Sequence, residues 1–138
     1  MNDLMNCYYN SDMTSIPQEP SSGTVDALKV ISGRVSVHGI GFSEQILNPP
    51  NLSYPYYGRP FILCGSTDMT DIYYKLHPVH SVNGFGLSFV IHPTGGNGIL
   101  FPDGVFLAKS LYAPQGSGVP VQDYARAIAI FYTGGANT

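Results

Sequence analysis

The segment FGLSFVIH, residues 85 to 92, constrains the fold more than any other stretch of this chain. Every second position carries a large apolar residue, namely Phe85, Leu87, Phe89 and Ile91. A period of two is typical of a β-strand with one apolar face, because successive side chains point to opposite sides of a sheet. The turn sequence Val-Asn-Gly precedes the segment and Pro93 follows it. We therefore predict a strand here, with its apolar face in the core.

Similar short patterns recur along the rest of the chain. Alternating or wholly apolar runs predict strands at 32–39, 61–68, 71–77, 99–101, 105–112 and 124–135. Pro-Asp-Gly at 102–104 predicts a hairpin between two of these runs. Residues 121–131 could form a helix, but the apolar, aromatic ending of the run favours a strand. About seven or eight short strands indicate an all-β fold, an antiparallel β-sandwich.

The first 24 residues have a different character. They are polar and aperiodic, and they end in proline and serine. One interpretation is a disordered tail. The other is an extended arm that orders against a neighbouring subunit, because the segment carries more apolar side chains than a solvated tail needs. We therefore divide the chain into an extended or disordered N-terminal arm, 1–24, and a β-sandwich domain, 25–138.

Charged residues are scarce. They make up 11% of the chain, against roughly 25% in an ordinary domain, and the net charge is −3. No basic cluster exists, so nucleic acid is not an expected partner. No apolar stretch of about 18 residues occurs, so membrane insertion is not expected either. A charge-poor surface is typical of a protein covered by neighbours, which indicates a homo-oligomer. Cys7 and Cys64 show no zinc-type spacing and are interpreted as free thiols.

Three residues form the only candidate metal site, and it is a weak one. His77, His80 and Asp71 lie close together in sequence and could bind a metal ion. The alternative is that the histidines are ordinary loop residues and that Asp71, with Asp68, is a turn former. No nucleophile with a partner base is recognisable in the sequence. We therefore expect no enzyme activity and no cofactor.

The tyrosines are the candidate ligand-binding residues. Tyr54, Tyr56 and Tyr57 lie in a proline-rich loop, and Tyr73 lies off the core face of its strand. Aromatic rings displayed on the loops of a β-scaffold are typical of recognition surfaces, including surfaces that bind sugars. The alternative is that these rings pack on the sheet or against another subunit.

The order of these segments resembles a known family. ISGRVSVHGIGF, GRPFILCGSTD, YYK, NGFGLSFVI and ARAIAIFYTGG follow one another as in the small β-sandwich modules of tailed-phage virions. The likeness is to the H-type-lectin-like domains of tail fibres and tips, and it covers about residues 25 to 135. The family usually has a tryptophan in its closing strand, whereas this chain contains none.

The resemblance implies a non-enzymatic structural protein of a phage particle. It implies a tail fibre, tip or receptor-binding module that forms a homotrimer in the virion. The N-terminal arm would contact other virion proteins, and exposed loops would contact a host-surface glycan or protein. Two alternatives stay open, a capsid decoration or head-fibre protein and a stand-alone carbohydrate-binding module.

Overall fold

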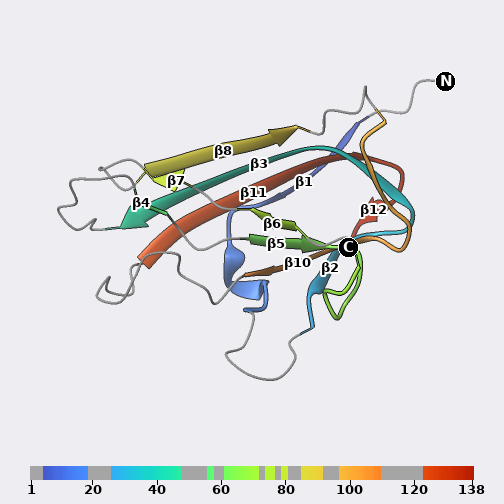
Figure 1. The fold of residues 1–138 in the computed structure, drawn as a ribbon, viewed down its shortest axis with the longest axis horizontal. Helices are drawn as coiled ribbons and strands as arrows, with labels where there is room; N and C mark the ends of the chain where they lie inside the picture. The colour runs from blue at the N-terminus through green and yellow to red at the C-terminus, as the bar shows by residue number, and fades with distance from the viewer. Residues whose placement is uncertain are drawn as a thin grey trace.

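The chain folds into two facing β-sheets (Figure 1). The structure is a computed structural model, and it describes residues 5–18, 26–47, 56–57, 61–71, 74–76, 79–80, 85–91, 97–109 and 123–138. Within these ranges every pairing between two strands is antiparallel, and the helical content is one 3-10 turn, η1 (Met13–Ser15). The prediction of an all-β sandwich is confirmed.

Each sheet has five strands. Sheet A has the order β1-β11-β3-β8. Its strands are β1 (Asn6–Asn10), β3 (Val35–Leu47), β8 (Phe85–Ile91), β9 (Ile99–Phe101) and β11 (Asp123–Thr133). β9 pairs with the first residues of β3, and β8 pairs with the residues that follow. Sheet B has the order β12-β2-β10-β5-β6; its strands are β2 (Leu28–Ser32), β5 (Phe61–Cys64), β6 (Tyr74–Leu76), β10 (Val105–Lys109) and β12 (Ala136–Asn137). A separate pair joins β4 (Tyr56–Tyr57) to β7 (Val79–His80).

The main core lies between the two sheets. Sheet A contributes alternate residues of β11, and sheet B contributes alternate residues of β5 and β10, all almost inaccessible to solvent: Ile128, Ile130, Tyr132, Phe61, Leu63, Val105 and Leu107. The rings of Phe42 and Phe61 meet edge-to-face across the core, with centroids 5.7 Å apart. Alternate burial of this kind is the physical basis of the sequence patterns that predicted these strands.

The inward face of β3 changes phase at a bulge. Val35 and Val37 are buried, but farther along the strand the buried residues are Ile40 and Phe42. Phe131 pairs with Gly39 and Tyr132 with Val37, which leaves His38 as an extra residue on β3. A bulge inserts one residue and so reverses the alternation beyond it. His38 is half-buried there and shares a 2.9 Å hydrogen bond with the Thr133 hydroxyl.

Sheet B is buried on both faces at its centre. The side of β5 and β10 away from the main core forms a second apolar cluster, whose buried members are Ala27, Ile62, Cys64, Phe106 and Ala108. The Lys29 ammonium lies 5.3 Å from the centre of the Phe106 ring, within cation–π range. Burial on both faces explains why the sequence of β5 reads as a continuous apolar run.

Three tight corners carry the chain from one sheet to the other at one end of the sandwich, on the right in Figure 1. Residues 33–34 join β2 to β3, residues 102–104 join β9 to β10, and residues 134–135 join β11 to β12. The predicted hairpin at 102–104 is therefore wrong, because β9 pairs with β3 while β10 pairs with β2 and β5. Phe101 and Val105 flank the turn, and both are buried in the main core.

Part of the predicted N-terminal arm is extended and lies against its own chain. β1 pairs with β11 along all five of its residues. The segment then passes through η1 towards sheet B (Figure 1), where the Lys109 amide donates a 2.8 Å hydrogen bond to the Pro17 carbonyl. Ile16 is buried in the main core. The apolar side chains noted in this segment thus have an intramolecular use, which an aperiodic sequence does not reveal.

Tyr132 joins the C-terminal end of the described chain to β1. Its buried hydroxyl donates a 2.6 Å hydrogen bond to Asn137 Oδ1, and Asn137 Nδ2 donates to the Cys7 carbonyl at 3.3 Å.

Replacing Tyr132 with phenylalanine should lower the free energy of unfolding by about 1 kcal/mol, because a buried hydrogen bond is lost. Urea denaturation measures this. Tyr74→Phe, at a half-exposed position of β6, is the control and should change nothing measurable; equal losses in both variants would contradict the assignment.

Candidate functional site

The predicted ligand-binding tyrosines and metal candidates lie mostly at the margins of the described structure. Tyr54, Tyr73 and His77 lie outside the described residues. Tyr56 and Tyr57 form β4, described here by its backbone alone, and Tyr56 pairs with His80 of β7. No sequence pattern indicated that the segment around Tyr56 would pair with the segment around His80.

Asp68 and Asp71 belong to one hydrogen-bonded turn. Asp68 Oδ1 accepts hydrogen bonds from the hydroxyls of Ser66, at 2.8 Å, and Thr70, at 2.7 Å. The amides of Thr70 and Asp71 both donate to Ser66 Oγ at 3.1 Å. Met69, at the tip of the turn, has a φ of 61°. These are the local bonds expected of turn-forming side chains. Within the described ranges, no three His, Cys, Asp or Glu residues are grouped as metal ligands would be.

The same bonds shift the titration of Asp68. Donation from the Thr70 hydroxyl, and then from Ser66, lowers the pKa of this carboxyl below its ordinary value of 3.8. A lowered pKa means that the turn is stabilised above the unfolded-state pKa and loses that stabilisation as the pH falls through the folded-state value. We expect NMR titration to give an Asp68 midpoint below 3.8, and Thr70→Val to raise it. Thr67→Val is the control, and an unchanged midpoint in Thr70→Val would contradict this assignment.

The two cysteines are free and differ in their surroundings. Cys7 is exposed on β1, whereas Cys64 is buried in the second apolar cluster. Burial raises the pKa of the Cys64 thiol to about 11. Since the thiolate is the reactive form, Cys64 is expected to be inert in the folded protein and Cys7 to react first. Cys7 therefore reports on the accessibility of the surface around it.

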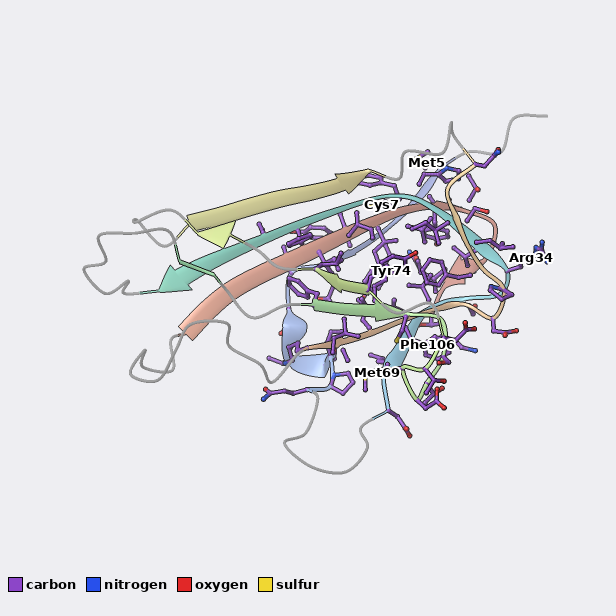
Figure 2. The ribbon with its side chains drawn as sticks, viewed as in Figure 1. Met5, Cys7, Arg34, Met69, Tyr74 and Phe106 are labelled. Atoms are coloured by element: carbon purple, nitrogen blue, oxygen red, sulfur yellow. The ribbon has the colours of Figure 1, made fainter. Side chains whose placement is uncertain are left out.

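The surface around Cys7 is the outer face of sheet A, which we call the open face. It is formed by outward-facing residues of β1, β3, β9 and β11, together with Met5, which precedes β1. Its described members include Met5, Cys7, Tyr9, Gly39, Gly41, Ser43, Leu100, Ala127, Ala129 and Phe131. Figure 2 shows Met5 and Cys7 on the opposite side of the molecule from Met69 and Phe106, which lie on the outer side of sheet B. Six large hydrophobic side chains are exposed in the described part of the chain, and four of them lie on the open face: Met5, Tyr9, Leu100 and Phe131.

A hollow of about 180 Å³ lies within the open face. Its floor consists of small residues on the two central strands, chiefly Gly41, Ala127 and Ala129. Two aromatic side chains rise beside it, Tyr9 with 66% of its surface exposed and Phe131 with 39%. The hollow is almost entirely apolar. The small residues thus leave a depression in the surface, and the two aromatic side chains project beside it.

No family model matches this chain, and no curated protein or solved structure matches it. A functional site in this chain therefore has to be inferred from the geometry of the chain itself. Among the residues described, no helix has the length and apolar character needed to cross a lipid bilayer.

The strand predicted at 85–92 is confirmed as β8, which lies beside β3 in sheet A. Gly39, Gly41 and Ser43 of β3 pair with Ile91, Phe89 and Leu87 respectively. The expectation that the apolar side chains of this strand face the core concerns side chains outside the described part of the structure.

Proposed function

We propose that this chain is a non-enzymatic structural protein of a phage particle, acting as a tail-fibre, tip or receptor-binding module. The observation that carries the proposal is the open face: a β-sandwich displays, on one of its two sheets, an apolar surface on which the described residues carry no charge. Exposed apolar patches of this kind mark contacts with other macromolecules. The likeness of the chain's strand order and turn residues to tail-fibre modules supports the location in a virion.

The chemistry of the described residues agrees with a role in contact. The side-chain hydrogen bonds of Asp68, Tyr132 and His38 are directed at neighbouring groups of the same chain and hold turns, a chain end and a bulge. Each of these polar side chains thus has a structural use. On the open face, by contrast, Tyr9 and Phe131 stay exposed among the described residues, which favours a contact with another molecule.

The test is to find where the protein lies and what it binds. Antibodies against the purified chain would be applied to phage particles from the source culture and examined by electron microscopy. Fluorescently labelled protein would be added to the host bacteria in parallel. The proposal predicts antibody label on the tail and saturable binding to host cells. Label over the capsid without cell binding would replace it with the decoration role, and the absence of the chain from particles would overturn it.

A further inference from the structure

We propose that residues 5–18, which we call the strap, exchange between copies of this chain. In the exchanged assembly, the strap of one copy occupies on a second copy the site that it fills here on its own body. This inference goes beyond the proposed function and does not depend on it. The arguments are the shallow attachment of the strap, the nature of its site and the hydrogen bonds that preserve its shape.

Few buried side chains attach the strap to the rest of the sandwich. The strap runs from the edge of sheet A through η1 towards sheet B (Figure 1), and among its described side chains Ile16 is the only buried one. Tyr8 is half-buried against the same core. The other attachments are chiefly backbone contacts, between β1 and β11 and from the Lys109 amide to the Pro17 carbonyl. Segments with few buried apolar contacts open at a lower free energy than the whole fold.

Release of the strap leaves both sheets paired. β1 is an edge strand, and β11 is joined to β3 along all 11 of its residues on the side away from β1. In sheet B, the pairing of β10 with β2 and β5 does not involve the strap. The strap can therefore open while the body of the sandwich persists and its site stays formed.

The vacated site is matched to the sequence of the strap. It consists of the edge of β11 that β1 occupies and of the space in the main core that Ile16 fills. An unpaired strand edge is a template for another strand, and a side-chain pocket beside it selects the sequence that binds. The segment that fits both features in this structure is the strap itself. A second copy brings the identical segment, so every contact of the strap can form between copies as it does within one.

The strap also carries its own shape. Asn10 Nδ2 donates a hydrogen bond to the Tyr8 hydroxyl at 3.0 Å, and Asn10 Oδ1 accepts one from the Asp12 amide at 2.8 Å. The Thr14 amide donates to Asp12 Oδ1 at 3.1 Å. All three bonds join residues of the strap, so they move with it and reduce the entropy that is lost when it binds again. Residues 19–25 connect the strap to the body. An extended connection of this length spans roughly 27 Å at most, which brings a neighbouring copy within reach.

The experiment records the location of the strap with a disulfide in the full chain. Cys7 lies directly opposite Phe131 across β1 and β11, so Phe131→Cys places two thiols side by side. Equal amounts of isotopically light and heavy protein are mixed, concentrated, incubated and oxidised, and the linked peptides are identified by mass spectrometry. Exchange should leave about half of the disulfides with one light and one heavy partner, as random pairing of identical straps requires. Disulfides that join peptides of a single label at every concentration would overturn the proposal.

Leu100→Cys is the matched control. Leu100 is 42% exposed, close to the 39% of Phe131, and it lies on the same face of sheet A but in β9. A thiol at this position meets Cys7 of another copy only by collision, so mixed disulfides should be rare. Circular dichroism confirms that both variants are folded. Mixed disulfides that are as frequent in Leu100→Cys as in Phe131→Cys would contradict exchange.

Amide hydrogen exchange in the unaltered chain tests the opening itself. We expect the amides of β1 to be at least about 10-fold less protected than those that join β3 to β11, because the strap opens while the sheets stay paired. Equal protection of the two sets would also overturn the proposal, since the strap would then leave its site only when the whole fold unfolds.

Discussion

Alanine in place of Gly104 should lower the free energy of unfolding by about 3 kcal/mol. Gly104 stands at the corner between β9 and β10 with a φ of 107°, a backbone conformation that costs other residues about 1–3 kcal/mol. A Cβ atom there would lie 2.5 Å from the Ile31 carbonyl oxygen, closer than real Cβ atoms approach backbone. Since Ile31 is held within β2, strain and crowding add together, and overpacking costs a further 1–3 kcal/mol or so. Urea denaturation at one fixed protein concentration measures the loss.

Gly33→Ala separates the two contributions. Gly33 also has a positive φ, 88°, but a Cβ atom there would have its nearest contact at 3.4 Å, an ordinary distance. This variant should lose only about 1 kcal/mol, from backbone strain alone. Equal losses at Gly33 and Gly104 would show that the close approach to Ile31 contributes nothing.

Replacing Phe61 with alanine should cost about 4 kcal/mol. Phe61 is fully buried in β5 and meets the Phe42 ring of the opposite sheet edge-to-face. Truncation removes the ring and leaves a cavity between two sheets whose backbones cannot close on it, and phenylalanine-to-alanine changes in cores cost roughly 3–5 kcal/mol. The measured quantity is the free energy of unfolding from urea titration, with far-UV circular dichroism as the signal.

Phe61→Leu is the companion variant. Leucine refills most of the space, so the loss should fall to about 1 kcal/mol. The ratio between the two losses tests whether Phe61 acts by filling volume. If Phe61→Ala lost as little as Phe61→Leu, the residue would not be a part of a tightly packed core.

Periodicity predicted which residues form strands, but not which strands meet. The run 85–92 was predicted as a strand and forms β8, because the alternation is a local property of the chain. The choice of partner strand is non-local: β8 lies beside β3, with Ile91 opposite Gly39 and Phe89 opposite Gly41. The bulge at His38 likewise depends on β11 and has no signature in the sequence of β3 itself.

Turn sequences likewise predicted where the chain turns, but not which sheets the flanking strands join. Pro-Asp-Gly at 102–104 correctly indicated a sharp turn, yet its flanking strands belong to different sheets. Gly33, Gly134 and Gly135 form the neighbouring corners, and the closeness of Gly33 to Gly135 is a property of the assembled end, which no single turn reveals. The candidate site was missed for a related reason: the apolar residues that form the open face come from four separate strands and look like core residues in sequence.

The position of β11 in sheet A affects how the protein is made. β11 lies between β1 and β3, and it is synthesised after both of them and after most of the rest of the chain. Until residues 123–133 leave the ribosome, β1 and the facing edge of β3 have no partner for their backbone amides and carbonyls. Sheet A must therefore be completed after this late segment emerges, through contacts between residues more than 75 positions apart. Such topologies fold slowly, and unpaired edges are prone to aggregate in the meantime. Chaperones that shield exposed strands during synthesis should raise the yield of soluble protein.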